Sequence, residues 1–113
     1  MTKVHVISVS HSISPMEIRR GLMFRKRPLR TNTGMLFHTG HRISRFWMKN
    51  TFIPLDVVFL NRNMRIMGYV TNTRPHSLSP ITIGRPSYYV LEMNAGWIER
   101  NNAKVGDLIS LSE

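Results

Sequence analysis

FWMKNTFIPLDVVFL, residues Phe46–Leu60, is the longest apolar run in the sequence. It nevertheless carries four polar or charged residues: Lys49, Asn50, Thr51 and Asp56. Because such side chains lose free energy when they leave water without a partner, each needs a hydrogen-bonding partner in the fold or a functional role. Pro54 cannot donate to a strand ladder, which predicts two strands, or one broken strand, with a bend or an edge at the proline.

Short elements are expected before this run. Residues 3–9 alternate polar and β-branched side chains, a pattern typical of a half-buried strand. Ser14, Pro15 and Glu17 form the start signal of a helix with a capping box. We expect this helix to end near Gly21 or Met23 and to bury Met16, Met23 and the stem of Arg20. A short strand over residues 34–37 and a polar connection over 38–45 complete this half.

The second half of the chain also reads as short strands. Strands are predicted over residues 55–60 and 64–70, joined by a hairpin turn at 61–63, and then over 88–93 and 108–111. Residues 71–86 contain three prolines and form a long loop, and residues 97–101 form a short helix. The predicted fold class is mainly β: a small sandwich or barrel-like domain of short strands with one or two short helices. We expect a single domain over residues 1–113.

Length and composition restrict the classes of protein. The chain has 113 residues and no cysteine, which excludes disulfides and thiolate zinc sites. The first residues lack the apolar stretch of a signal peptide, and no run reaches the length of a membrane span. We therefore expect an intracellular protein without membrane insertion. A compact form of this kind suits a virus- or phage-encoded protein that acts in the host cell.

The charge balance indicates a polyanionic partner. Sixteen Lys and Arg residues stand against six Asp and Glu residues, for a formal net charge of +10. Twelve of the sixteen are arginine, whose planar guanidinium suits bidentate contact with phosphate. A strongly basic domain is typical of nucleic-acid binding, although charge alone also keeps a protein in solution. The candidate phosphate-binding residues are Arg19, Arg20, Arg25, Lys26, Arg27, Arg30, Arg42 and Arg45.

Common catalytic motifs are absent, and only two carboxylates lack a local explanation. No Walker loop, GxGxxG, HExxH, GxSxG or zinc-finger spacing occurs. Glu17 belongs to the capping box, Glu99 to a surface helix, Asp107 to a turn in which it bonds nearby amides, and Glu113 is terminal. Asp56 and Glu92 remain, each within an apolar strand. Together they could hold Mg²⁺ or Mn²⁺ for phosphodiester cleavage, with Lys49 stabilising charge, or each could be held in a structural role by Arg, Lys or backbone amides.

Several sequence blocks together resemble one family. They include RGLMFR (20–25), GMLF (34–37), FWMKNT (46–51), PLD (54–56) and YVLE (89–92), in the order and near the spacing of domain-of-unknown-function family 192. The resemblance extends from Ser14 to Leu111 and implies a small mainly-β domain with a short N-terminal helix. It implies no settled activity. The family's signature positions fall on Arg20, Gly21, Met23, Gly34, Met35, Phe46, Trp47, Met48, Lys49, Asn50, Pro54, Asp56, Glu92, Gly96 and Asp107.

Three hypotheses for the function remain open. The first is a nucleic-acid-binding protein, preferably for DNA, whose phosphate contacts are largely independent of sequence. The second is a divalent-metal nuclease that uses Asp56, Glu92 and Lys49. The third is a module that binds a small anionic ligand or an acidic protein at the cluster Trp47, Lys49, Asn50 and Thr51. Aromatic residues between the arginines could also stack on bases, although aromatics in short strands are more often core residues.

Overall fold

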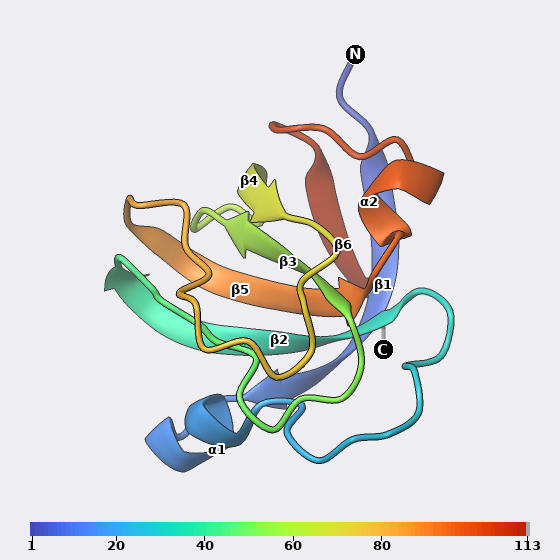
Figure 1. Cartoon of the computed structure of the whole chain (residues 1–113). Coiled ribbons are helices and arrows are strands. Elements are labelled where there is room, and N and C mark those ends of the chain that lie inside the picture. The colour runs from blue at the N-terminus through green and yellow to red at the C-terminus, as the bar shows by residue number, and fades with distance from the viewer. Residues whose placement is uncertain (113) are drawn as a thin grey trace.

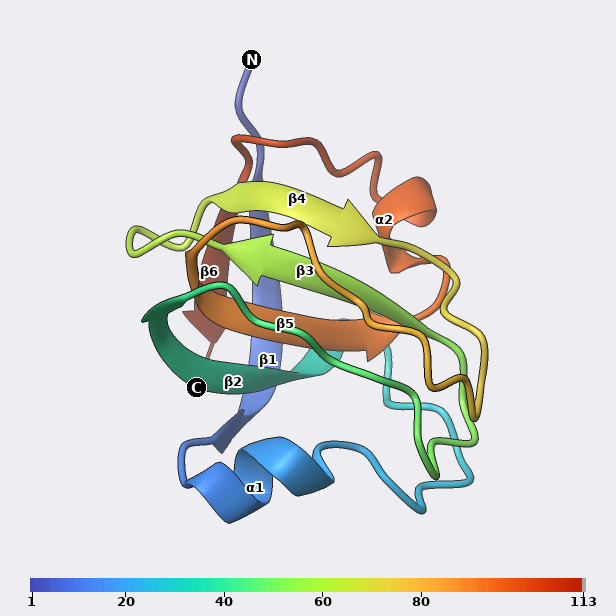
Figure 2. The same cartoon turned by 60° about the vertical axis from the view of Figure 1, so that its left-hand side comes forward.

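A single curled sheet with two short helices makes up the computed structural model, which describes residues 1–112 (Figures 1 and 2). The strands are β1 (Val4–Ser12), β2 (Thr33–Arg42), β3 (Leu55–Leu60), β4 (Ile66–Val70), β5 (Ser87–Asn94) and β6 (Leu108–Ser112). The helices are α1 (Pro15–Arg20) and α2 (Trp97–Arg100), which lie at opposite ends of the molecule in both views. The predicted mainly-β class is confirmed.

The strands lie in the order β4-β3-β5-β2-β1-β6. β1 pairs in parallel with both β2 and β6, and the other neighbours pair antiparallel. The two edge strands meet where the Ile66 amide donates to the Asp107 carbonyl and the Ile109 amide to the Met64 carbonyl, each at 2.9 Å. These bonds occupy edge groups that would otherwise be unpaired, and the sheet therefore has a barrel-like shape.

The two faces of the sheet bury separate apolar clusters. Ile7, Leu36, Leu91 and Ile109 belong to an inner cluster, to which every strand contributes and which α2 closes with Trp97. On the outer face, β2, β3 and β5 bury Phe37, Val57, Phe59 and Val90 under the loops that flank β3. Because side chains alternate along a strand, successive residues of β3 and β5 face opposite sides of the sheet.

The opening stretch is half strand and half loop. Leu55–Leu60 forms β3, as predicted, and all six of its residues are buried. Residues 46–50 do not form a strand, so that prediction is wrong. Instead, Phe46 makes an isolated bridge with Ile81, and the Met48 amide donates to the Ser77 carbonyl at 2.9 Å. The two loops that flank the β3–β4 hairpin are thus hydrogen-bonded to each other across the outer cluster.

Two other expectations need correction. The strand predicted over 34–37 continues as β2 to Arg42, with an irregular register between His38 and Arg42, where a polar connection was expected. Helix α1 has the predicted capping box, in which the Glu17 amide donates to Ser14 Oγ at 3.1 Å and the Ser14 amide to Glu17 Oε1 at 2.9 Å. No residue of α1 is buried, however, because the helix lies at the end of the curl rather than on its face.

Within residues 1–112, no helix has both the length and the apolar character needed to cross a membrane.

Candidate functional site

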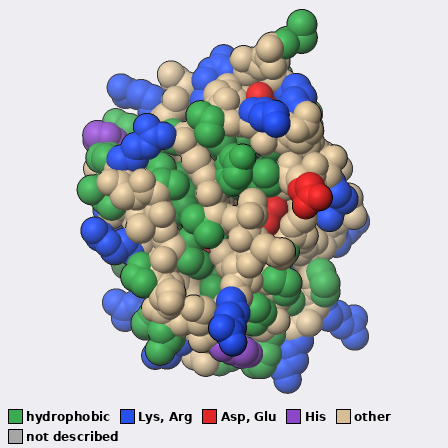
Figure 3. Space-filling view, turned by 45° about the horizontal axis from the view of Figure 1, so that its top comes forward, with side chains coloured by type: hydrophobic (Ala, Val, Ile, Leu, Met, Phe, Trp, Pro, Cys, Tyr) green, Lys and Arg blue, Asp and Glu red, His purple; other side chains and the backbone are tan. Residues whose placement is uncertain are grey.

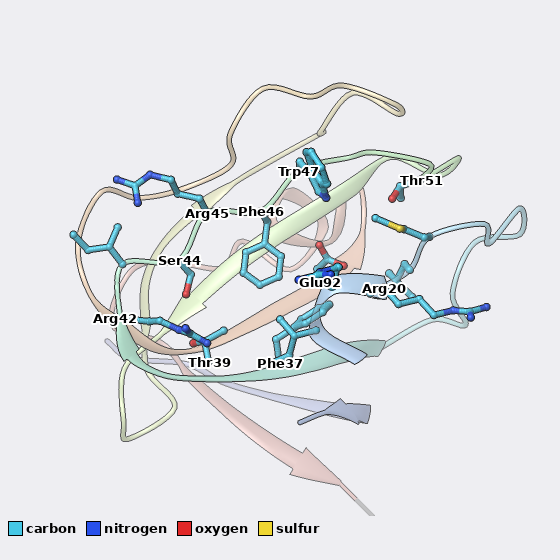
Figure 4. A pocket seen from close by; sticks show the side chains of 16 residues that line it. Arg20, Phe37, Thr39, Arg42, Ser44, Arg45, Phe46, Trp47, Thr51 and Glu92 are labelled. Carbon is cyan, nitrogen blue, oxygen red and sulfur yellow. The ribbon is translucent and has the colours of Figure 1, made fainter. Parts of the chain in front are cut away.

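A pocket of about 360 Å³ lies over the outer face of the sheet, beside the end of α1 (Figure 4). Its walls come from α1 and the residues just after it, from β2, and from the segment that follows β2. Sixteen residues line it, and those that matter below are Arg19, Arg20, Gly21, Phe37, Thr39, Arg42, Ser44, Arg45, Phe46, Trp47, Thr51 and Glu92. The volume is at the lower end of the range for small-molecule sites, roughly 300–1,000 Å³.

Glu92 of β5 is the acidic group of this pocket. It pairs in register with Val57 on one side and Met35 on the other, so its side chain lies on the outer face. Only 4% of the residue is exposed, and within residues 1–112 its carboxyl group has no hydrogen-bond partner or ion pair. Burial raises the pKa of this carboxyl to about 8. At neutral pH, Glu92 is therefore mainly a neutral acid that can both donate and accept a hydrogen bond.

Gly21 keeps the space in front of Glu92 open. Helix α1 ends there with a φ of 47°, in the region that favours glycine. A Cβ atom at this position would lie 3.2 Å from Phe37 Cζ and 3.7 Å from Glu92 Oε1. The glycine of the RGLM block therefore ends the helix and also leaves room for the carboxyl group.

A second buried polar group in the pocket has no partner. Ser44 is 7% exposed, and its Oγ has no hydrogen-bond partner within the described chain. By contrast, Thr39 Oγ1 donates to the Tyr88 carbonyl and Thr51 Oγ1 to the Lys49 carbonyl, both at 3.2 Å. Two buried groups outside the pocket, Ser87 Oγ and Trp97 Nε1, also lack partners in residues 1–112, so the unpaired Ser44 does not by itself indicate a ligand. The carboxyl group of Glu92 is the buried acid that a ligand in the pocket would meet.

Four exposed arginines surround the pocket. Arg19 and Arg20 come from α1, Arg42 from the end of β2, and Arg45 from the following segment. In Figure 4, Arg42 and Arg45 lie toward one end and Arg20 toward the other, with Glu92 between them. Within residues 1–112 the only ion pair within 4.0 Å joins His5 to Asp107, so none of the four is neutralised by a carboxylate. The mouth of the pocket is therefore strongly positive.

The other candidate phosphate-binding residues, Arg25, Lys26, Arg27 and Arg30, lie beside this pocket rather than in it. Arg25 and Arg20 both line a second, shallower hollow of about 350 Å³ next to the end of α1. Arg25 Nε also donates to the Arg27 carbonyl at 3.2 Å, and Lys26 Nζ lies 5.6 Å from the centre of the Phe52 ring. Arg27 and Arg30 are exposed. Of the eight predicted basic residues, the main pocket thus brings together Arg19, Arg20, Arg42 and Arg45.

Asp56 does not join Glu92. It pairs in register with Met93, whose side chain belongs to the inner cluster, so the two carboxylates point to opposite faces of the sheet. Asp56 Oδ1 accepts from the Asn72 amide at 3.0 Å and Oδ2 from the Ile98 amide at 2.9 Å. These bonds attach the segment after β4 and helix α2 to β3. The structure therefore does not assemble the predicted pair of metal ligands, and it gives Asp56 a structural environment.

The predicted cluster around Lys49 is only partly in the pocket. Trp47 and Thr51 line it, while the Lys49 ammonium lies over the Trp47 ring, 5.1 Å from its centre. Asn50 has a φ of 54°, and its carbonyl accepts from the Phe24 amide at 2.7 Å, which attaches the chain after α1 to this loop. Asn50 therefore has a role in the turn, and Lys49 is not placed next to Glu92.

Histidines and aromatics are dispersed. His38 Nε2 lies 2.8 Å from His11 Nδ1, while His41 stacks on Tyr88. Residues 1–112 contain no group of three or more side chains suited to a metal ion. Among the predicted stacking aromatics, Phe46 and Trp47 line the pocket, and Trp97 is buried in the inner core.

Sequence reasoning missed several pocket residues. Ser44 lies in a polar connection, where a buried hydroxyl has no signal in the sequence. Phe37 and Thr39 belong to β2, and only the register shows that they share a face with Glu92. Gly21 could be found from its position after a capped helix, where a glycine is expected to end the helix. Glu92 itself was identified because an unexplained acid stood in an apolar strand.

The family assignment is confirmed by comparison. The family model of DUF192, described as "Uncharacterized ACR", matches residues 1–111, so this chain belongs to that family. A search of curated proteins found no match.

Two solved structures are similar. One, from Sinorhizobium meliloti 1021, is called a "putative transcription regulator"; it is 36% identical, with a TM-score of 0.87, and the match covers 90% of this chain and 79% of that one. The other, a protein of unknown function from Novosphingobium aromaticivorans, is 34% identical, with a TM-score of 0.85, over 90% of this chain and 73% of that one.

Proposed function

We propose that this chain is a small basic nucleic-acid-binding protein whose phosphate contacts are largely independent of sequence. The observation that carries the proposal is the group of four arginines around one pocket, Arg19, Arg20, Arg42 and Arg45, none of which pairs with a carboxylate in residues 1–112. Guanidinium groups bind phosphate oxygens in bidentate geometry. Free arginines gathered on one rim therefore suit a polyphosphate backbone.

The overall charge supports the same partner. The net charge of +10 gives a long-range attraction for polyanions, and Figure 3 shows Lys and Arg side chains on several sides of one face. Exposed hydrophobic side chains lie between them, which suits contact with sugars and bases as well as with phosphates. The name of the Sinorhizobium meliloti protein, a "putative transcription regulator", agrees with a role at nucleic acid.

Salt dependence tests this proposal. If six or more phosphates are contacted, the affinity for a short DNA falls on the order of 10³-fold between 50 and 200 mM salt. The double variant Arg42→Gln/Arg45→Gln should reduce the slope of log affinity against log salt by about 2, because each lost phosphate contact reduces it by about 1. Fluorescence anisotropy with a labelled oligonucleotide measures both quantities.

The matched control is Arg100→Gln/Lys104→Gln. It removes the same formal charge from exposed positions in and after α2, at the opposite end of the molecule from α1. We expect this control to change the slope much less than the pocket variant does. Equal effects of the two variants would show that only net charge matters, and affinity that is independent of salt would remove the proposal altogether.

A module for a small anionic ligand is the second candidate. It is favoured by the pocket, whose lining combines the buried carboxyl group of Glu92 with four arginines that form no ion pair within residues 1–112. Titration calorimetry with inorganic phosphate and mononucleotides, at a salt concentration where DNA does not bind, would detect it.

The metal-nuclease alternative is not favoured, because Asp56 and Glu92 lie on opposite faces of the sheet. A plasmid-cleavage assay with Mg²⁺ or Mn²⁺, with and without EDTA, checks that alternative directly.

A further inference from the structure

We infer that the pocket takes the base of one unpaired nucleotide, with Glu92 hydrogen-bonding to the edge of the base and the surrounding arginines binding the adjacent phosphates. This inference rests on the nucleic-acid binding proposed above and makes it more specific. It concerns a nucleotide unit, which could belong to a strand or be free in solution.

The chemistry of the pocket changes from its floor to its mouth. The floor carries Glu92, a buried carboxyl group that can donate and accept at the same time while it is protonated, and Ser44 lies on the other side of Phe46 (Figure 4). Phe37 and Phe46 line the wall, with their rings in edge-to-face contact at 5.0 Å between centres. The mouth carries the four arginines. A ligand that fits has a polar edge, a flat apolar body and anionic groups at the other end. A nucleotide has these three parts in this order.

The protonation of Glu92 determines which base edge fits. A neutral carboxyl group donates through its hydroxyl and accepts through its carbonyl, which complements N1 and the amino group of adenine, or N3 and the amino group of cytosine. An ionised carboxylate only accepts, which complements the N1–H and amino group of guanine. The charged groups that line the pocket with Glu92 are Arg19, Arg20, Arg42 and Arg45.

The base must be unpaired to make these contacts. Base pairing in a duplex occupies the edge that Glu92 would bind, and the base is then stacked away from any pocket. A protein that reads base edges in a pocket accordingly prefers single strands, loops or bases extruded from the stack. The phosphate contacts at the mouth remain available to any strand.

The test uses a single-stranded oligonucleotide that consists of abasic sites except for one central adenine, compared with the fully abasic strand. We expect the adenine to tighten binding about tenfold at neutral pH, the size of one stacked and hydrogen-bonded base. Glu92→Leu should remove this gain. Glu92→Gln should retain it, because an amide also offers one donor and one acceptor and pairs with adenine. Arg100→Gln/Lys104→Gln is the control and should retain the gain.

The outcomes separate this inference from the proposed function. If the strands bind with steep salt dependence but the abasic strand binds as tightly as the one with adenine, the base pocket is excluded and phosphate binding stands. If no strand binds, the proposed function fails. In that case, mononucleotide binding by the wild type that Glu92→Leu abolishes would support the pocket for a free nucleotide, and no mononucleotide binding would exclude the pocket as well.

A change of pH gives a second readout that a purely structural Glu92 would not produce. With one central guanine in place of adenine, wild-type affinity should rise relative to adenine between about pH 6.5 and about pH 8.5, as the carboxyl group ionises. Glu92→Gln cannot ionise and should show no such change. A shift of equal size in the variant would assign the effect to other groups and overturn this part of the inference.

Discussion

Glu92 is a carboxylic acid in a place where an apolar side chain would cost less free energy. Val57 and Met35, its register partners on the outer face, are both apolar, and no basic group pairs with the carboxyl in residues 1–112. An unpaired buried charge is expensive, so the group remains protonated well above the ordinary range of a glutamate. A residue that lowers stability in this way is a strong candidate for function.

The raised pKa of Glu92 makes stability depend on pH. The unfolded chain loses this proton near pH 4.5 and the folded chain only near pH 8, so the unfolded state binds fewer protons between these values. The stability that the protonated Glu92 contributes is therefore fully present below about pH 4.5 and is lost as pH rises from there through about 8. Glu92→Gln should remove this decline. The free energy of unfolding of the variant, relative to that of the wild type, should therefore be higher at pH 8.5 than at pH 4.5, by up to about 5 kcal/mol.

Urea unfolding at several pH values measures this effect. The informative quantity is the difference in the free energy of unfolding between variant and wild type at each pH, because other groups titrate equally in both. A constant difference from pH 4.5 to 8.5 would show that Glu92 titrates normally in the folded protein, and the argument for a neutral acid in the pocket would then be lost.

Asp56 has the opposite character, because both of its oxygens have partners. Asp56→Ala leaves the buried Ile98 amide and the Asn72 amide without acceptors. At about 1–3 kcal/mol for each of the two lost partners, we expect a loss of about 2–6 kcal/mol in the free energy of unfolding. Glu99→Ala is the control, since Glu99 is an exposed carboxylate of α2 and its removal should change stability by less than about 0.5 kcal/mol. Chemical denaturation of both variants makes the comparison, and equal stabilities would contradict the structural role.

At the scale of single elements, the end of α1 links helix termination to the shape of the pocket. Gly21→Ala places a methyl group 3.2 Å from Phe37 Cζ at a φ of 47°. Backbone strain of this kind costs about 1–3 kcal/mol, and the crowding adds to it. We expect lower stability together with weaker binding in the pocket, measured by thermal unfolding and by the oligonucleotide titration described above.

Gly40→Ala separates the two causes. Gly40 also has a positive φ, 70°, but a Cβ atom there would meet nothing within 4 Å. This variant therefore carries the backbone strain without the contact with Phe37 and Glu92. If Gly40→Ala weakens binding as much as Gly21→Ala does, crowding of the pocket is not the reason.

Local sequence patterns predicted an element well where an apolar run or a helix-capping signal coincides with it. β3, β5 and β6 follow apolar runs, and α1 follows its capping box. Residues 46–48 look equally apolar, but their neighbour is the loop around Ile81 rather than a strand, and the sequence does not contain that information. The same limit applies to α1: its start could be predicted, but its exposed position at the end of the curl depends on tertiary packing.

The candidate site was predictable residue by residue but not as an arrangement. Elimination left Asp56 and Glu92 as the unexplained acids, and both are indeed buried. The predicted metal pair is not formed, because the two side chains lie on opposite faces of the sheet. A shift of one residue in register decides which face a side chain occupies, and the register follows from strand order rather than from the sequence of either strand. Arg42 and Arg45 were identified by charge, whereas Ser44 between them carried no signal.

At the scale of the whole molecule, Asp107 ties together segments from the two ends of the chain. Its carboxylate accepts from the Lys3 amide at 3.1 Å, from the Lys104 amide at 2.9 Å and from His5 Nε2 at 2.9 Å. The next residue, Leu108, bridges to Arg65 where β6 meets the edge strand β4. The closure of the curl therefore depends on a carboxylate that lies at the start of β6 and is only 2% exposed.

Loss of this carboxylate should weaken the closure and change the response to acid. The hydrogen bond from His5, together with those from the two amides, lowers the pKa of Asp107 to about 2. Because the folded pKa lies below the ordinary value of 3.8, the stabilisation is present above pH 4 and is lost as pH falls through about 2. Asp107→Asn should cost about 1.5–3 kcal/mol at pH 7, the value of a hydrogen bond to a charged group, and much less near pH 2. Denaturation at the two pH values measures the difference, and a cost that stays constant down to pH 2 would show that the charge of Asp107 does not hold the curl closed.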